Sequence, residues 1–491
     1  MAKQLIYDIH DKPPMGKRLI FAFQQFLAIL AATIAVPTLI GLPTQIPAAI
    51  FGAGVGTLVY QLFTKFKSPV FLGSSFAFLG SLGVALTYGY CGIVLGSIVA
   101  GLVYVVLAIV IHFVGTEWVT KLMPPVIIGP TVTLIGLSLA GNAMGDIVKA
   151  NSAPAMYHDY NLAALACGLI TFATILICSI QKKYTMPKLI PFVIGIAVGY
   201  GAASVLTLIG ILTNAEYLKI VDWTPVVNNF VDAEGNFVGL SAFFTVPDFA
   251  AIEAVKELLN GSVSEEVLAA TEGNSSVITS GGIAEVIIAF MPVALVVFAE
   301  HIADHKNLSS IIEKDLIEEP GLKRTLLGDG VGSIMGTIFG VCPNTTYGES
   351  VGCVAVTRNA SVVTITTTAF MCMILAFFSP LTTALQTIPS CVMGGVCLTL
   401  YGFIAISGLK MLKNVDLNQT KNMFVIAAIL IAGIGKLSIL IPYAVAESGE
   451  IVKTIQITPI ATALILGIAT NSLLNCIEKG KNKKNDNKTD N

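Results

Sequence analysis

The feature that most constrains this sequence is a series of long apolar runs, set one after another along its 491 residues. An α-helix needs roughly 17–25 predominantly apolar residues to cross a bilayer. Runs of that length recur, for example at 93–114, 189–212 and 362–378. Only 12% of the residues are charged, against about 25% in a typical soluble domain. The sequence therefore predicts an all-α protein that crosses the membrane many times.

There are fourteen candidate spans, and two of them are poor helices. The spans lie near residues 18–37, 46–64, 69–86, 92–114, 125–143, 162–180, 188–212, 282–301, 326–341, 344–357, 360–383, 388–408, 420–440 and 455–476. Those at 69–86 and 344–357 are short of apolar length and rich in Gly, Pro, Ser and Thr. Irregular backbone at membrane depth survives only where protein or a polar cavity satisfies it. These two segments are therefore candidates for a ligand site, with a purely architectural re-entrant loop as the alternative.

The basic residues predict the orientation, because lysine and arginine gather in cytoplasmic loops. With a cytoplasmic N-terminus, only five of the 28 basic residues fall outside: Lys149, Lys219, Lys256, Lys436 and Lys453. The acidic loop at 213–281 then lies outside, and the tails at 1–17 and 477–491 lie in the cytoplasm. We expect a multi-pass protein of the cytoplasmic membrane, surrounded by lipid. The net charge of −2 gives no sign of a nucleic-acid partner.

The sequence contains a repeat, with seven spans on either side of the acidic loop. Three pairs of segments match in the same order: 51–58 with 327–334, 73–76 with 344–347, and 123–129 with 388–394. An odd number of spans per half gives the two halves opposite orientations in the membrane. Inverted repeats of this kind are typical of secondary transporters, which bind substrate near mid-membrane where the halves meet.

The eighth span ends in four ionisable residues: Glu300, His301, Asp304 and His305. Glu300 and Asp304 are four residues apart, so they share a helix face. Two carboxylates at that spacing repel, and burial further disfavours charge, so we expect one proton to be shared or carried between them. An acid in a span costs about 2.5–3.5 kcal/mol on insertion scales, which favours a functional role. The alternative is a hydrated helix end, and we expect His305 to mark the cytoplasmic exit.

Two further motifs suggest other chemistry. His301 and His305 are four apart, as in a zinc-binding HxxEH-like motif, with Asp304 in the place of the glutamate. Residues 348–352 fit the GxSxG pattern of a nucleophile elbow, but they follow a loop in a membrane region rather than a strand of a parallel sheet. An intramembrane zinc hydrolase is therefore a remote alternative, and we expect no catalytic residue and no metal.

The remaining interpretation is a site that binds a small neutral heterocycle. Glu300 and Glu349, on different spans, can each accept a hydrogen bond from a ring N–H. Backbone groups near Phe76 and at Tyr347 and Gly348 can complete the hydrogen bonding, and the aromatic rings offer stacking faces. A carboxylate that binds a ring N–H and also titrates couples ligand to proton.

The same residues resemble the signature of a known family. Residues 343–352 (PNTTYGESVG) with Thr357-Arg358 are similar to the signature of the nucleobase–ascorbate transporter family, also called nucleobase:cation symporter-2, nearest its bacterial uracil permeases. Other matching segments are 73–76 (GSSF), 299–301 (AEH), 320–326 (PGLKRTL) and 392–395 (VMGG). The resemblance spans roughly residues 10–475.

The resemblance implies an architecture of fourteen segments in a seven-plus-seven inverted repeat, with short antiparallel strands in segments 3 and 10. A core domain would combine 18–114 with 282–383, and a gate domain would combine 125–212 with 388–476. Proton-coupled uptake would proceed by movement of the core against the gate, commonly in a homodimer. No cofactor is implied beyond the proton as coupling ion.

The resemblance also implies roles for individual residues. Glu300 and Glu349 would hold the polar edge of a uracil ring, and main-chain groups at Phe76 and Gly348 would assist. Tyr401 would close the pocket from the gate side. The remaining candidates are Tyr347 and Ser75 for substrate, Glu300, Asp304 and Asp329 for proton coupling, and Gln25 and Ser350 as further pocket residues.

Three positions depart from the family's pattern. Ser350 stands where the signature usually has Asn, which shortens that polar contact, and Gln25 stands where span 1 often has His. Some uracil permeases have His at the place of Asp304. Here His305 is one residue further on, about 100° around the helix, and is not expected to substitute. Purine-specific relatives tend to have Gln where Glu349 stands, so Glu349 favours uracil.

We therefore expect a proton-coupled uracil importer. A xanthine or uric acid permease of the same family is the alternative, and a passive channel is a remote one. A channel should have a continuous polar pore, whereas the repeat predicts a closed mid-membrane pocket.

Overall fold

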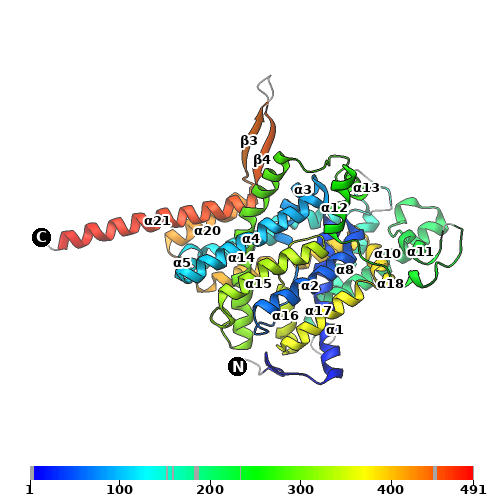
Figure 1. Cartoon of the computed structure of the whole chain (residues 1–491), viewed down its shortest axis with the longest axis horizontal. Helices are drawn as coiled ribbons and strands as arrows, with labels where there is room; N and C mark the ends of the chain where they lie inside the picture. The colour runs from blue at the N-terminus through cyan, green and yellow to red at the C-terminus, as the bar shows by residue number, and fades with distance from the viewer. Residues whose placement is uncertain are drawn as a thin grey trace.

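A computed structural model describes residues 5–489 except 151–152, 157–159, 182–186, 189, 233 and 446–450. The outermost residues of the two predicted tails, 1–4 and 490–491, lie outside this described part. The long helices lie side by side in one body, from which the end of the C-terminal helix and a two-stranded hairpin project (Figure 1).

The first half of the protein runs from residue 15 to residue 213. Its elements are α1 (Met15–Leu39), η1 (Pro43–Gln45), α2 (Ile46–Phe63), β1 (Leu72–Ser74), η2 (Phe76–Phe78), α3 (Leu79–Leu86), α4 (Gly89–Val114), α5 (Glu117–Leu122), α6 (Pro125–Ser138), α7 (Ala140–Asp146), α8 (Leu162–Ile180) and α10 (Pro191–Thr213). Local signals set several helix starts. Proline stands in the first turn of α2, α6 and α10, where its missing N–H costs nothing. The Asn161 side chain caps α8 by accepting from two backbone N–H groups.

The second half runs from residue 280 to residue 489 in the same order. Its elements are α14 (Ser280–Ile312), η5 (Ile317–Gly321), α15 (Leu322–Phe339), β2 (Asn344–Thr346), α16 (Gly348–Thr357), α17 (Val362–Leu375), α18 (Ser379–Gln386), α19 (Ser390–Met411), η6 (Leu412–Asn414), α20 (Thr420–Ile434), β3 (Ile439–Val445), β4 (Ile451–Ile457) and α21 (Pro459–Thr489). Thus β1, η2 and α3 of the first half correspond to β2 and α16 of the second.

The predicted fold class is confirmed. Within the described residues, nine helices are long and apolar enough to cross a membrane, and three shorter apolar helices accompany them: Phe76–Leu86, Val362–Leu375 and Thr420–Ile434. α15 and α16 complete the fourteen predicted segments, since α15 contains charged residues and α16 has only 10 residues.

Two span ends were predicted wrongly. The eighth span does not end near residue 301, because α14 continues to Ile312. His305 is therefore in the helix and fully buried, not at a cytoplasmic exit. The thirteenth span stops at Ile434, and residues 439–445 and 451–457 form the paired strands β3 and β4 instead. Lys436 has a positive φ, which ends the helix, and the following β-branched run with Pro442 favours extended backbone.

The repeated glycine motifs explain how the halves come together. α2 and α15 cross so closely that a Cβ on Gly52 would lie 2.1 Å from the Gly336 carbonyl oxygen, and one on Gly56 would lie 2.8 Å from that of Gly332. Small residues allow this backbone approach between membrane helices. The segment match at 51–58 and 327–334 therefore marks the crossing of the two repeats.

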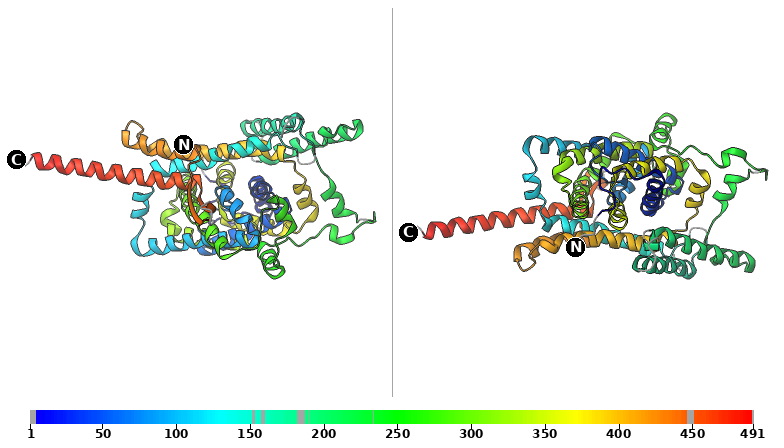
Figure 2. Two further views of the ribbon diagram at one scale, coloured as in Figure 1. Left: turned by 90° about the horizontal axis from the view of Figure 1, so that it is seen from above. Right: turned by 90° about the horizontal axis from the view of Figure 1, so that it is seen from below.

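The helices form two groups by their packing. In one group, α1, α2, α3, α4, α14, α15, α16 and α17 contact one another; in the other, α6, α8, α10, α19, α20 and α21 do. Figure 2 shows α8, α10 and α20 along one side of the body. Each group contains elements of both halves. The division of the helices by packing therefore differs from the division of the sequence into two repeats.

The segment between the halves is folded. It contains η3 (Glu216–Leu218), α11 (Thr224–Phe230), η4 (Gly239–Ala242), α12 (Ala250–Asn260) and α13 (Glu265–Ala270). α12 packs on α4, and the Glu257 carboxylate accepts hydrogen bonds from the backbone N–H groups of Tyr90 (2.8 Å) and Ser264 (3.2 Å). Glu257 therefore caps the N-terminus of α4.

Replacing Glu257 with Ala is expected to lower the thermal unfolding midpoint of the purified protein in detergent. The change removes the acceptor for two backbone N–H groups, a loss of about 0.5–2 kcal/mol for a helix cap. Glu265→Ala, at an exposed acid of α13, is the matched control. An unfolding midpoint for Glu257→Ala equal to that of the control would rule out the cap.

Candidate substrate-binding site

A cavity of about 420 Å³ lies between the two helix groups. Its residues on the first group include Ser75, Phe76, Glu300, Asp304, Thr345, Thr346, Tyr347, Gly348 and Glu349. Its residues on the second group include Val132, Phe192, Phe403, Ser407 and Lys410. This volume is in the range of small-molecule sites. Elements of both halves of the repeat contribute to its lining.

Two short strands form the centre of the site. β1 and β2 pair antiparallel, with Leu72 opposite Thr346, Gly73 opposite Thr345 and Ser74 opposite Asn344. These are the strands predicted in segments 3 and 10. Directly after them η2 with α3, and α16, begin at the cavity, so two helix N-termini face it. The first N–H groups of a helix have no intrahelical acceptor, and they favour a carbonyl or other electron-rich group.

Three of the candidate acids line the cavity. Glu300 and Asp304 lie one turn apart on α14, and Glu349 lies in the first turn of α16. The Oε2 atom of Glu300 is buried and has no hydrogen-bond partner among the described residues. The Asp304 Oδ2 atom accepts a hydrogen bond from Thr346 Oγ1 (2.6 Å). Glu300 is therefore an unused acceptor in the cavity wall.

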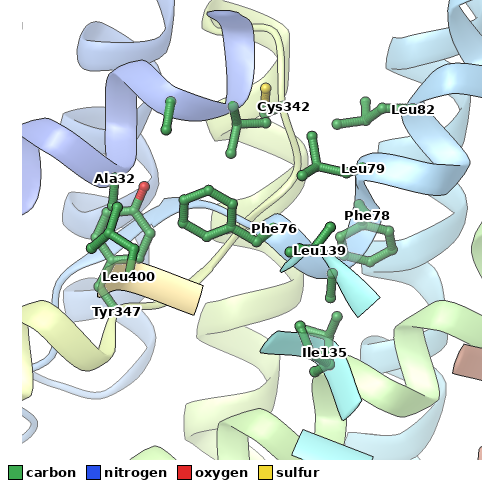
Figure 3. Close-up of a cluster of buried hydrophobic side chains, with 14 of the residues drawn as sticks. Ala32, Phe76, Phe78, Leu79, Leu82, Ile135, Leu139, Cys342, Tyr347 and Leu400 are labelled. Atoms are coloured by element: carbon green, nitrogen blue, oxygen red, sulfur yellow. The ribbon is translucent and has the colours of Figure 1, made fainter. Parts of the chain in front are cut away.

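Ser75 and Phe76 line the same cavity. Ser75 Oγ is buried in the cavity wall without a hydrogen-bond partner in the described part of the protein. The Phe76 ring meets Tyr401 edge to face, with centroids 5.5 Å apart at 84°. Tyr401 is not among the residues that line the cavity; it backs Phe76 from α19. Figure 3 shows Phe76 in a cluster with Leu139, Leu400 and Tyr347, which come from both helix groups.

Tyr347 joins the two strands as well as lining the cavity. Its hydroxyl donates to the Ser74 carbonyl (3.2 Å) and its ring lies on Gly73. A Cβ at Gly73 would come within 2.3 Å of that ring, so only glycine fits there. Because Tyr347 is held against β1, it restrains the position of the next residue, Gly348, which is exposed to the cavity.

Asp329 lies off the cavity, in a fully buried pair with His301 (Nδ1 to Oδ2, 2.6 Å). The other ring nitrogen of His301 meets Thr325 Oγ1 (3.0 Å), and that hydroxyl donates its hydrogen to the Leu322 carbonyl. His301 Nε2 must therefore be a donor. One hydrogen then lies between Nδ1 and Oδ2, so the pair is neutral whichever atom holds it. The structure thus gives His301 a role as the hydrogen-bond partner of Asp329 and Thr325, whereas the sequence alone gave it none.

His305 has a structural role. Its Nδ1 donates to the His301 carbonyl (2.7 Å), so its Nε2 accepts from the Tyr60 hydroxyl (2.8 Å), which in turn accepts from Ser68 (2.8 Å). All four ring nitrogens of His301 and His305 are thus bound to protein groups. The geometry gives the zinc interpretation no support.

Gln25 and Ser350, two of the departures from the family's pattern, contact each other. Gln25 Nε2 donates to Ser350 Oγ at 2.6 Å, and both side chains are buried. Neither residue is among those that line the cavity. They hold α1 against α16 instead.

Several polar groups at the site were not singled out from the sequence, among them Thr346, Lys188 and Lys410. Thr346, the partner of Asp304, lies in the matched segment 344–347, and that match was the available signal. Lys188 and Lys410 line one end of the cavity, and single lysines at span ends gave no signal of this.

Broken segments that meet at an acidic pocket, within an inverted repeat of apolar helices, define a membrane transporter rather than an enzyme. A family model described as "Permease family", for xanthine and uracil permeases, matches residues 16–440. The chain therefore belongs to the nucleobase–ascorbate transporter family.

Individual relatives agree with this assignment. The chain is 34% identical over 475 residues to a uracil permease of Bacillus caldolyticus, covering 96% of this chain and 94% of that protein. It is 31% identical over 429 residues to the uracil permease of Escherichia coli strain K12, covering 87% and 86%.

Solved structures share the fold at low identity. The murine anion transporter Slc26a9 has a TM-score of 0.55 at 11% identity, covering 95% of this chain and 69% of that one. The transmembrane domain of the cyanobacterial bicarbonate transporter BicA has a TM-score of 0.50 at 13% identity, covering 96% and 100%. These likenesses concern the architecture alone.

Proposed function

We propose that this protein imports uracil across the cytoplasmic membrane together with protons. The main support is that Glu300, on the eighth span (α14), and Glu349, on α16 of the broken tenth segment, line one cavity. Uracil offers two ring N–H donors and two carbonyl acceptors. Carboxylates suit the N–H groups, and the helix N-termini and Ser75 suit the carbonyls. The names of the relatives point to the same substrate.

Alternating access would use the two helix groups as its moving bodies. The core would be 18–114 with 282–383 and the gate 125–212 with 388–476. The cavity extends to Lys188 and Lys410, at the end that the lysine and arginine distribution assigns to the cytoplasm, where both termini would also lie. The structure then corresponds to an inward-facing state. A homodimer is the assembly that the family resemblance favours.

Proton coupling would involve Glu300 and Asp304. Both acids face the cavity and lie one helical turn apart, so the two negative charges oppose each other in a poorly solvated place. A bound proton relieves that repulsion. Asp329 is the third candidate from the sequence. It would influence proton coupling through its neutral pair with His301, and it would not contact the substrate.

Labelled uracil should accumulate in proteoliposomes in response to an inward proton gradient. One proton per uracil and one pH unit allow up to about tenfold accumulation, because one unit corresponds to about 1.4 kcal/mol. A protonophore should abolish the accumulation. Uptake that ignores the gradient would exclude symport and favour a passive channel. Stronger competition by xanthine than by unlabelled uracil would reassign the substrate to purines.

A further inference from the structure

Strand β2 holds two buried acids, one on each side. Thr345 Oγ1 donates to Asp329 Oδ2 (3.4 Å), and Thr346 Oγ1 donates to Asp304 Oδ2 (2.6 Å). Successive side chains of a strand point to opposite faces, so the two threonines point to different sides. The strand therefore connects α15 and α14 through one hydroxyl each.

The two acids differ in what surrounds them. Asp329 is fully buried and already shares a hydrogen with His301. Asp304 lines the cavity, and within the described residues the Thr346 hydroxyl is its only side-chain hydrogen-bond partner. Of the two, Asp304 is the acid that can exchange a proton with the cavity.

Thr346 is also joined to the substrate-binding backbone. Two residues further on, Gly348 is open to the cavity, and Glu349 follows it. A Cβ placed on Gly348 would lie 3.9 Å from Asp304 Oδ1, so the acid is next to this backbone. Tyr347, between them, is tied to β1 through the Ser74 carbonyl. A change in the Asp304 side chain can therefore move Gly348 through few intervening groups, which are themselves held in place by hydrogen bonds.

We propose that Thr346 is a positioning residue that links protonation of Asp304 to uracil binding; this rests on the proposed function. A carboxylate accepts the Thr346 hydroxyl hydrogen, and this bond to a charged group holds α14 against β2. When the oxygen facing Thr346 takes a proton, the hydroxyl loses its acceptor and must turn or accept instead. The first residues of α16, Gly348 and Glu349, then shift with the proton.

Other charged groups face the same region. They are Glu300, His301 and His305 on α14, Asp329 on α15, Glu349 on α16, and Lys188 and Lys410 at the cavity's end. The two histidines and Asp329 are held by the bonds described above, and the two lysines lie at the exposed end. The nearest charges to Asp304 at the cavity are Glu300, one turn away on α14, and Glu349, on α16.

The experiment compares three variants of the full protein. Thr346→Val removes the hydroxyl at nearly constant volume, and Thr346→Ser keeps it. Thr337→Val makes the same change at a buried threonine of α15 that does not line the cavity and whose hydroxyl donates to the Ser333 carbonyl. Uracil affinity is measured in detergent over a range of pH, and gradient-driven accumulation and uracil exchange are measured in proteoliposomes.

For Thr346→Val we expect the pH at which uracil affinity changes to move upward by about one unit, a tenfold change. The ionised form of Asp304 loses its donor, so it takes up a proton more readily. Accumulation should fall several-fold while exchange continues. Thr346→Ser should restore the wild-type pH profile, and Thr337→Val should leave the profile in place even if it lowers thermal stability.

An unshifted pH profile with wild-type accumulation in Thr346→Val would overturn this link while leaving the proposed function intact. A wild-type protein that neither binds nor accumulates uracil would overturn both. If Thr346→Val does not fold, Thr346→Cys replaces it in the same assays, because an S–H group is of similar size and a weaker donor.

Discussion

Replacing Glu349 with Gln is expected to weaken uracil binding by about 1.5–3 kcal/mol, the scale of a hydrogen bond to a charged group. Glu349 lies in the first turn of α16 and faces the cavity. Gln keeps the shape but offers one acceptor and an NH₂ group, which opposes a ring N–H. The measurement is uracil affinity of the purified protein, by calorimetry in detergent.

Glu313→Gln is the matched control, since Glu313 is an exposed acid just beyond α14. Its affinity should equal that of the wild type. The same comparison with xanthine separates affinity from specificity: Glu349→Gln should lose more affinity for uracil than for xanthine. Wild-type uracil affinity in Glu349→Gln would remove Glu349 from the binding site.

Replacing Glu300 with Gln is expected to abolish proton-driven accumulation of uracil. The neutral amide cannot take up and release a proton, and it offers one acceptor where the carboxylate has an unused buried oxygen. Affinity should also fall by about 1.5–3 kcal/mol. The measurement is accumulation in proteoliposomes under an inward proton gradient, with uracil exchange at saturating concentration measured beside it.

Comparing the rate of gradient-driven accumulation with the rate of uracil exchange separates proton coupling from substrate binding. If Glu300 both binds substrate and carries the proton, exchange at saturation should survive in Glu300→Gln better than accumulation does. Glu300→Asp, which keeps the charge on a shorter side chain, should retain gradient dependence with reduced affinity. Gradient-driven accumulation at the wild-type level in Glu300→Gln would place the coupling proton elsewhere.

Local sequence was sufficient for most of the fold. Apolar length marked the spans, and α8 begins and ends where the pattern placed it, at Leu162 and Ile180. The repeat at 73–76 and 344–347 marked the two paired strands. These features follow from hydrophobic length and from chain symmetry, both of which are visible along the chain.

Other features depend on partners that are distant in sequence. Apolar length placed the end of α14 near residue 301, yet the helix continues because Tyr60 and Asp329, from α2 and α15, satisfy His305 and His301 inside the protein. The same holds for the site. Glu300 and Asp304 stood out as acids in an apolar run, whereas Thr346 became significant only when its hydroxyl was seen against Asp304. Sequence shows which groups are costly to bury, and the fold shows which groups compensate for them.

The contact between Gln25 and Ser350 bears on how this protein can be re-engineered. Gln25 is long and flexible and Ser350 is short, and together they span the gap between α1 and α16 with a bond of 2.6 Å. A change in the length of one side chain alone would break this bond or crowd the two helices. For grafting segments or for interpreting variants, we therefore expect these two positions to act as one unit.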